Sequence, residues 1–375
     1  MRALITGGAG FIGTHLARRL LAEGLEVVVL DVFSPQVHGD NRDLAPDLQG
    51  PVRLVRGDIR DRSALRLALD GVEAVIHLAA ETGTGQSMYE VARYSEVNLQ
   101  GTAQLMDLLV NAPDRRVRHL VVASSRAIYG EGRYRCPLDG VVFPGARSPE
   151  ALAQGRFEPA CPACGLPLES LPTSEDTPPA PTSFYGLTKL VQERMGLLFG
   201  GTLGIATHAL RFQNVFGPGQ SLRNPYTGIL AIFCGLARAG EPLRVFEDGR
   251  ESRDFVHVHD VVEATWRALN HEPPGPLALN VGSGIATTLA EVAAEIVSHL
   301  GSRSRIQVTG EFRIGDIRHN RADLTRVREH LGFAPTTSFR EGLAEFLDWA
   351  SEARPATGGY ARSLEELRSR GLMHV

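Results

Sequence analysis

The chain has 375 residues, of which 43% are hydrophobic and 22% are charged, and its formal net charge is −4. This length predicts two lobes, and this composition excludes a disordered, collagen-like or coiled-coil protein. The charge provides no basic field for nucleic acid or an anionic membrane, and no apolar run approaches the ~20 residues that cross a bilayer. Because the N-terminus lacks the apolar segment and cleavage site of a signal peptide, we expect a cytoplasmic protein.

The first half of the chain alternates short apolar strands with helical stretches. Residues 2–5 are an apolar strand that runs into a glycine-rich turn, and a helical pattern follows. The largely apolar segment 26–30 is typical of a parallel strand that helices cover on both faces. Further strands, with helices between them, are expected at 52–55, 73–78 and 118–123. This alternation predicts an α/β fold with a Rossmann-like, doubly wound parallel sheet.

The pattern changes in the second half. Residues 131–181 are rich in Pro, Gly, Arg and Cys and show no long periodicity. A helix is expected over 183–199 and a strand over 205–211. The remainder mixes short strands with helices and predicts a smaller α/β lobe at the carboxyl edge of the sheet. These helices are expected at 226–239, 259–271, 288–300 and 338–350.

Three glycines follow the first strand at a spacing of three. Gly7, Gly10 and Gly13, with Phe11 and Ile12 in the same turn, stand between a strand and a helix. Glycines there let the turn tighten and the backbone approach a pyrophosphate, which the N-terminus of the helix binds. The pattern predicts a dinucleotide site; the alternative is a plain α/β turn.

Two acidic residues stand where the next strands end. Asp31 follows the second strand and can accept hydrogen bonds from a ribose diol. No basic residue occupies 32–34 to bind a 2′-phosphate, which favours NAD over NADP. Asp58 follows the third strand and can bind the adenine amino group, with Ile59 against the ring.

The fourth strand ends in His77, followed by Leu78, Ala79 and Ala80. The small residues let the backbone approach the cofactor. His77 is a catalytic candidate, but the sequence favours a structural role because no partner acid stands at a clear spacing.

A Tyr–Lys pair, Tyr185 and Lys189, lies at i and i+4 of a predicted helix and therefore on one face. Lys189 is the only lysine among 39 basic residues. A Tyr hydroxyl is a poor base at neutral pH, and a nearby cation lowers its pKa. We therefore expect Tyr185 to act as the base and Lys189 to lower its pKa and bind the cofactor ribose; the alternative is a surface pair.

Seven motifs occur in order: GGAGFIG, HLAA, SSRAIYG, YGLTK, RFQNVFGPGQ, RDFVHVHD and NVGSG. Together they resemble the extended short-chain dehydrogenase/reductase family, specifically its nucleotide-sugar epimerases and dehydratases. The resemblance runs from residue 1 to about 350, interrupted at 131–181. It implies bound NAD, a nucleotide-diphosphate sugar as substrate, and a homodimer formed through helices near 87–111 and 183–199.

The resemblance divides the chain into regions. It implies a NAD-binding Rossmann domain over 1–200, with 131–181 as an insertion. A mainly substrate-binding lobe covers 201–350, from which 205–216 and 255–265 return to the first domain. Residues 351–375 are expected to be a C-terminal appendage.

The resemblance also assigns residues to roles. Ser125 would bind the sugar hydroxyl and share its proton with Tyr185, with Lys189 as the third catalytic residue. The family implies further cofactor contacts at Asn98, Ala123 and Phe212. It implies further substrate contacts at Thr82, Arg126, Asn214, Arg253 and Arg318. For Arg318, a surface position beside Asp316 and Asp323 is an equal alternative.

The reaction type depends on the two residues after Ser125. Dehydratases of the family have Asp-Glu there to remove water, whereas this chain has Arg126 and Ala127. The resemblance therefore favours a 4-epimerase, in which C4 is oxidised by NAD and hydride returns to its other face. The alternatives are a 4-ketoreductase that releases its cofactor and a non-catalytic NAD-sensing scaffold.

Three of the four cysteines lie in the segment 131–181. Cys136, Cys161 and Cys164, with Asp139 as the weakest member, offer the four ligands of a structural zinc. The alternatives are a loop of free thiols or a histidine as fourth ligand. The dTDP-deoxysugar 4-epimerase subgroup resembles this chain in carrying a Cys-bearing insertion. Its place between Ser125 and Tyr185 leads us to expect that it caps the sugar pocket.

Overall fold

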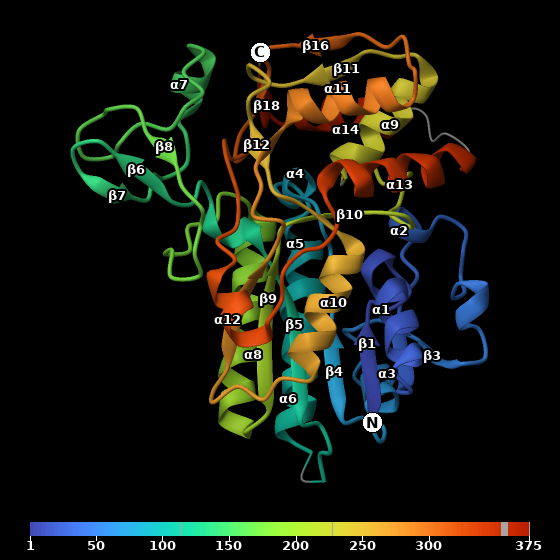
Figure 1. The fold of residues 1–375 in the computed structure, drawn as a ribbon. Coiled ribbons are helices and arrows are strands. Elements are labelled where there is room, and N and C mark those ends of the chain that lie inside the picture. The colour runs from blue at the N-terminus through green and yellow to red at the C-terminus, as the bar shows by residue number, and fades with distance from the viewer. Residues whose placement is uncertain (113, 227, 354–358, 375) are drawn as a thin grey trace.

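The computed structural model describes residues 1–112, 114–226, 228–353 and 359–374, and its central layer is a parallel sheet (Figure 1). Seven strands pair in the order β14-β9-β5-β4-β1-β2-β3. Winding reverses between β1 and β4, and such a switch point opens a crevice at the carboxyl ends of the strands. The predicted Rossmann-like sheet is confirmed. Its strands are β1 (Arg2–Thr6), β2 (Glu26–Asp31), β3 (Val52–Arg56), β4 (Ala74–His77), β5 (His119–Ser125), β9 (Ala206–Phe212) and β14 (Leu277–Val281).

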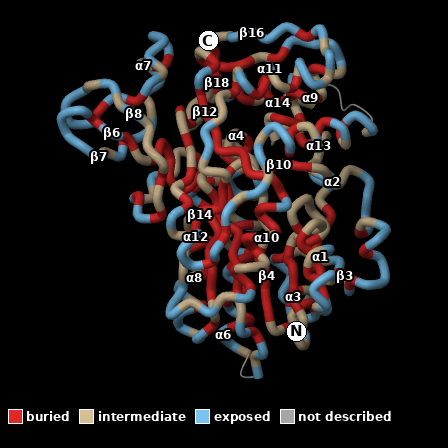
Figure 2. The backbone as a smooth tube through the Cα atoms, in the orientation of Figure 1, coloured by how far each residue is buried: buried red, intermediate tan, exposed pale blue. Residues whose placement is uncertain are grey.

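Each face of the sheet has its own apolar core, because successive side chains of a strand face opposite sides. In β1, Ala3 and Ile5 belong to one core and Leu4 to the other, and all three are buried. The strands are accordingly buried along most of their length (Figure 2). The first core includes helices α1 (Phe11–Ala22), α10 (Val258–Leu269) and α12 (Thr325–Leu331). The second includes α3 (Arg62–Ala68), α6 (Gly101–Val110) and α8 (Phe184–Leu203).

The helix expected over 87–111 is interrupted. A π-helical segment, η2 (Ser95–Gln100), joins α5 (Val91–Tyr94) to α6. π-helical turns occur frequently at functional sites. Here the turn carries Asn98, whose amide donates to Thr188 Oγ1 of α8 at 2.9 Å and accepts from the backbone N–H of Glu81 at 2.7 Å. Asn98 therefore fixes the loop after β4 against α8.

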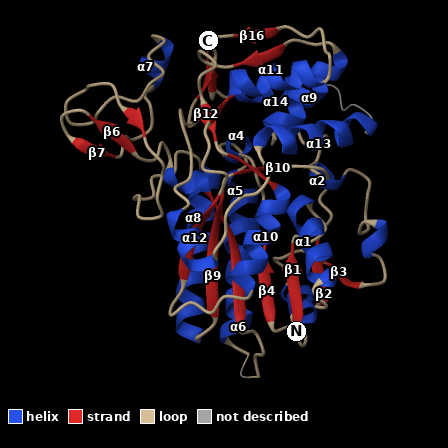
Figure 3. Cartoon of the chain, viewed as in Figure 1, coloured by secondary structure: helices blue, strands red, loops and turns tan. Residues whose placement is uncertain are grey.

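A smaller lobe lies beyond the carboxyl ends of the sheet (Figure 3). Its apolar core is enclosed by α9 (Ile229–Ala239), α11 (Leu289–His299) and α13 (Phe339–Glu352), close to three of the predicted helices. Short strand pairs complete it: β10 (Asn214–Phe216) with β13 (Phe255–His257), β11 (Leu243–Val245) with β16 (Ile306–Val308), β12 (Ser252–Arg253) with β15 (Thr287–Thr288), and β17 (Phe312–Arg313) with β18 (Met373–His374).

The segment 131–181 projects from the body of the protein (Figure 1). It contains a three-stranded antiparallel sheet of β7 (Gly140–Val142), β6 (Tyr134–Cys136) and β8 (Glu169–Ser170), and the short helix α7 (Pro149–Ala153). A buried arginine, Arg147, anchors it by pairing with Glu131 at 2.9 Å and with Glu247 of the smaller lobe at 2.8 Å.

The remaining elements are short, apart from the last helix. They are α2 (Pro35–His38), η1 (Pro46–Leu48), α4 (Thr84–Ser87), η3 (Arg126–Tyr129) and α14 (Gly359–Arg368). Within the part of the chain that the structure describes, no helix has both the length and the apolar character needed to span a bilayer.

Candidate active site

A cavity of about 830 Å³ opens at the carboxyl ends of the strands, where the sheet faces the smaller lobe. Its wall gathers most of the residues that the sequence assigns to cofactor and substrate, although they come from distant parts of the chain. These residues are Gly7, Gly10, Phe11, Ile12, Gly13, Asp31, Asp58, Ile59, Leu78, Ala79, Ala80, Thr82, Ser125, Arg126, Tyr185, Asn214 and Arg253.

The glycine turn forms a cradle for an anion. Gly10 is the N-cap of α1 and offers no side-chain cap, so the N-terminus of the helix faces the cavity uncovered. Gly7 has a φ of 69°, and a Cβ there would lie 3.0 Å from the backbone of Ala79. A Cβ on Gly13 would lie 2.6 Å from the Cα of Gly8. The turn therefore requires glycine, and it fits the pyrophosphate of NAD.

The two acidic residues are held differently. Asp31 accepts hydrogen bonds from the backbone N–H of Ala9 at 3.0 Å and of Phe33 at 2.8 Å, which fix its carboxylate at the end of β2. Asp58 pairs with Arg60 at 2.7 Å. An adenine amino group that binds Asp58 therefore competes with the Arg60 guanidinium, and the sequence analysis did not predict this ion pair.

Ser125 ends β5, and Tyr185 lies in the first turn of α8. The N-cap Ser183 accepts a hydrogen bond from the backbone N–H of Gly186 at 3.1 Å and so begins the helix at this point. A Cβ on Gly186 would lie 2.4 Å from the carbonyl oxygen of Ala127. This glycine therefore lets the helix that carries Tyr185 approach the loop that follows Ser125.

Burial raises the pKa of Tyr185 above its ordinary value, while the Ser125 hydroxyl and the Arg126 guanidinium lower it. Burial lowers the pKa of Lys189 to about 7, and Lys189 Nζ donates to Gln192 Oε1 at 3.0 Å. The sequence assigns the charge effect on Tyr185 to Lys189. In the structure, the Arg126 guanidinium lowers the pKa of Tyr185, and Lys189 is not among the residues that line the cavity.

Other predicted contacts also lie behind the wall. Asn98, Ala123 and Phe212 are buried and do not line the cavity. The amide of Asn98 is already engaged by Glu81 and Thr188, so Asn98 positions the wall from behind.

Neither interpretation of Arg318 is correct. Its side chain is fully buried, away from the cavity wall. It pairs with Glu158 of the insertion at 2.6 Å, and with Glu247 at 3.0 Å and Asp248 at 2.7 Å in the smaller lobe. Arg318 therefore anchors the insertion, and sequence spacing could not place its acidic partners beside it.

A buried ion pair holds helix α8 in place. Arg211 of β9 pairs with Glu193 of α8 through two hydrogen bonds, at 2.7 and 2.9 Å. Glu193 also accepts from Ser124 Oγ at 2.6 Å, and Arg211 donates to Tyr129 Oη at 2.8 Å. The pair therefore joins α8 to the end of β5, next to Ser125.

His77 has a structural environment. It is buried, with Nδ1 2.8 Å from Thr6 Oγ1 and Nε2 2.9 Å from Thr102 Oγ1. Burial, and to a lesser extent Lys189, lowers its pKa to about 3, so the ring stays neutral. This agrees with the role that the sequence favours.

Helix α14 closes one side of the cavity. The described part of 351–375 is therefore not the appendage that the sequence analysis expects, because this helix lines the site. Tyr360, Leu364 and Leu367 of this helix line the wall. Glu366 accepts hydrogen bonds from Tyr89 and Tyr226, both at 2.8 Å. The spacing of the three lining residues is an apolar helical stripe, the signal that could have revealed this contact.

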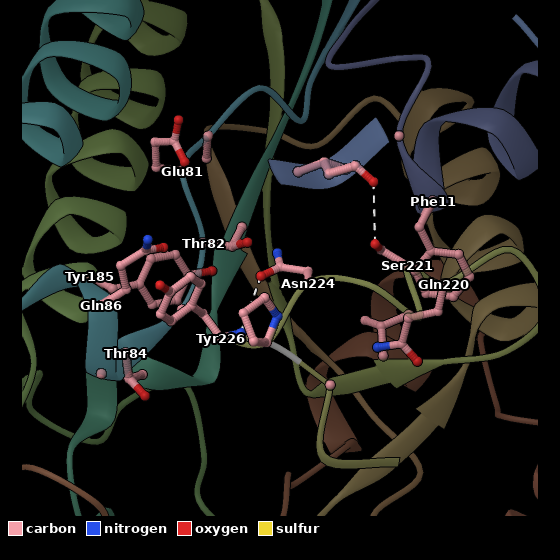
Figure 4. A pocket seen from close by; sticks show the side chains of 18 of the residues that line it. Phe11, Glu81, Thr82, Thr84, Gln86, Tyr185, Gln220, Ser221, Asn224 and Tyr226 are labelled. Atoms are coloured by element: carbon pink, nitrogen blue, oxygen red, sulfur yellow. Dashed lines mark hydrogen bonds between the residues drawn. The ribbon is translucent and has the colours of Figure 1, made fainter. Parts of the chain in front are cut away.

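Several polar wall residues were given no role from the sequence, because most lie outside the seven motifs and Gln220 only ends one of them. Figure 4 shows Glu81, Thr84, Gln86, Asn224 and Tyr226 on the side of Tyr185 and Thr82, and Gln220 and Ser221 on the side of Phe11.

The expectation that the insertion caps the pocket is wrong. None of its described residues lines the cavity. Its four candidate metal ligands do come together, with Cys136 Sγ 3.4 Å from Cys164 Sγ, and Asp139 Oδ2 3.1 Å from Cys161 Sγ. All four ligand atoms lie within 4.8 Å of one another, and no described histidine belongs to the group.

Comparisons with known proteins agree with this site. The sequence matches the NAD dependent epimerase/dehydratase family over residues 3–149 and 160–282. It is 40% identical over 356 residues to a dTDP-L-rhamnose 4-epimerase of Burkholderia thailandensis, covering 94% of this chain and 95% of that protein.

Solved structures share the whole fold. MoeE5 in complex with UDP-glucuronic acid and NAD superposes with a TM-score of 0.75 at 32% identity, covering 94% of this chain and 99% of that one. The UDP-glucose 4-epimerase of Thermus thermophilus, in complex with NAD, has a TM-score of 0.73 at 28% identity, covering 94% and 100%. With its glycine turn, cavity and family match, the chain belongs to the NAD dependent epimerase/dehydratase family.

Proposed function

We propose that this protein is a NAD-dependent nucleotide-sugar 4-epimerase whose substrate is a dTDP- or UDP-sugar. The observation that carries the proposal is the grouping of Ser125, Tyr185 and Arg126 at the cavity, with Ala127 following them. An alanine provides no acid or base for the elimination of water. The 40% identical relative, named a dTDP-L-rhamnose 4-epimerase, supports this reaction type.

The residues of the chain handle the proton. NAD bound in the cradle supplies reversible hydride acceptance from C4 of the sugar. Tyr185 Oη removes the C4 hydroxyl proton and returns it after the sugar has turned, with Ser125 sharing that proton. Arg126 favours the phenolate because it is a nearby cation. Asn214 and Arg253 on the wall would hold the diphosphate while the sugar turns.

We also propose a structural zinc bound by Cys136, Asp139, Cys161 and Cys164. Three thiolates and a carboxylate satisfy a tetrahedral zinc, and their spacing supports this geometry. The insertion has little apolar core of its own, so metal binding would supply folding energy. Because the insertion does not line the cavity, the metal acts on structure and not on catalysis.

A homodimer is the third part of the proposal. Leu187 and Leu198 of α8 are exposed and stand eleven residues apart, which places them on one face of the helix. Val91 and Val110, at the ends of the α5–α6 stretch, are also exposed. These apolar side chains suit a contact between two copies, and gel filtration that shows only a monomer would contradict it.

The purified enzyme should invert C4 of a dTDP- or UDP-sugar without added NAD, as followed by NMR over a panel of nucleotide sugars.

Tyr185→Phe should lower kcat by at least ~10²-fold while NAD remains bound, because general acid–base catalysis has this size. Tyr134→Phe is the matched control, since that buried tyrosine lies in the insertion and does not line the cavity. A need for added cofactor would indicate a 4-ketoreductase. Normal turnover by Tyr185→Phe would exclude Tyr185 as the base.

Replacing Arg126 should change the pH profile. The positive charge lowers the pKa of Tyr185, so Arg126→Gln should raise the apparent pKa of the acidic limb of kcat. Activity should then fall at neutral pH and recover as pH rises, because the phenolate of Tyr185 forms only at a higher pH. Arg126→Lys should preserve much of the original profile. If kcat of wild type and of Arg126→Gln has the same apparent pKa on its acidic limb, the charge of Arg126 does not act on Tyr185.

Metal analysis tests the zinc proposal. Cys161→Ser should lower the metal content by about one equivalent per chain, with loss of sulfur-rich coordination, and should make 131–181 a protease target. Asp139→Ala should weaken metal affinity. Cys234→Ala, remote and in the core of the smaller lobe, should leave the metal in place. A metal-free protein with a protease-resistant insertion would end the proposal.

A further inference from the structure

A second group of metal-ligating side chains lies where α10 meets α13, away from the cavity wall. His257 ends β13 and is the N-cap of α10, His259 lies in the first turn of α10, and Glu345 lies on α13. Their ligand atoms lie within 4.8 Å of one another. His257 Nε2 is 3.6 Å from Glu345 Oε2, and the two imidazole centroids are 4.7 Å apart.

His257 has an unexplained environment. Its side chain is buried, yet neither ring nitrogen has a hydrogen-bond partner among the residues that the structure describes. Buried polar atoms are nearly always bonded, and the 3.6 Å separation from Glu345 is too long for a hydrogen bond.

Two glycines pack against one edge of this ring. A Cβ on Gly217 would lie 2.9 Å from His257 Nε2, and a Cβ on Gly342 would lie 2.9 Å from Cδ2. Glycine at both positions therefore keeps side chains away from the nitrogen nearest Glu345. His15 lies beside His259, but its Nε2 is 2.8 Å from the carbonyl oxygen of Pro218 and is already engaged.

We propose that His257, His259 and Glu345 bind a divalent transition-metal ion of the zinc class, with water as the fourth ligand. Two imidazoles and a carboxylate are a zinc ligand set. Tetrahedral bonds of about 2.0–2.2 Å hold ligand atoms roughly 3.3 Å apart, close to the His257–Glu345 separation. His259 and Glu345 are exposed, so the ion can enter from solvent.

The ion would connect the two lobes. It joins the N-terminus of α10, which packs on the sheet, to α13, which encloses the core of the smaller lobe. His257 also packs against Gly217, whose loop continues to Gln220 on the cavity wall. The metal ion would therefore hold the two lobes together beside the cavity, although none of its three ligands lines the cavity.

Cobalt titration of the chelator-treated full-length protein tests the proposal, because Co²⁺ reports its ligands. A site of nitrogen and oxygen ligands gives visible d–d absorption without thiolate-to-cobalt charge transfer, so it can be counted apart from the cysteine cluster. Co²⁺ or Zn²⁺ should also raise Tm, since the ion binds only the folded state. Chains with Cys161→Ser should keep this binding.

His259→Ala and Glu345→Gln should each weaken this Co²⁺ affinity at least ~10-fold, since even outer-shell changes have this effect. Both side chains are exposed, so the fold should tolerate the changes. Glu352→Gln, an exposed residue on the same helix, is the matched control and should bind Co²⁺ normally. Unchanged affinity in both variants, or cobalt absorption only of the thiolate type, would overturn the proposal.

Discussion

The buried ion pair between Arg211 and Glu193 is the interaction on which the active site depends most. Glu193 lies two turns beyond Tyr185 on α8, and its carboxylate also binds the hydroxyl of Ser124, the neighbour of Ser125. One buried charge pair thus fixes the helix that carries Tyr185 against the strand that carries Ser125. Breaking a buried pair by removing one partner costs about 3–5 kcal/mol, because the remaining charge is left uncompensated.

Contiguous motifs in the sequence predicted the sheet and the catalytic wall because their geometry is local. Strand ends of a parallel sheet meet at one edge, which locates Asp31, whereas the family resemblance assigns Ser125 in the motif SSRAIYG. The four zinc ligand candidates also came together, since two short turns hold them.

The errors all concern contacts between distant segments. Arg318 looked available from its sequence neighbours, but its acidic partners lie on the insertion and on the loop after β11. Tertiary folding also turned the insertion away from the cavity and brought α14 onto it. The Arg126 guanidinium lowers the pKa of Tyr185, an effect that the sequence assigns only to Lys189, whose ammonium donates to Gln192. Of these contacts, helix periodicity carries a signal only for α14, whose apolar stripe faces the cavity.

The central claim is that C4 is oxidised and reduced within one active site. A nucleotide sugar carrying deuterium at C4 tests it most directly in water with no added cofactor. The account predicts a C4-inverted product that keeps its deuterium at C4, as measured by NMR and mass spectrometry. Inversion with loss of deuterium to solvent, or release of the label on free reduced cofactor, would contradict it.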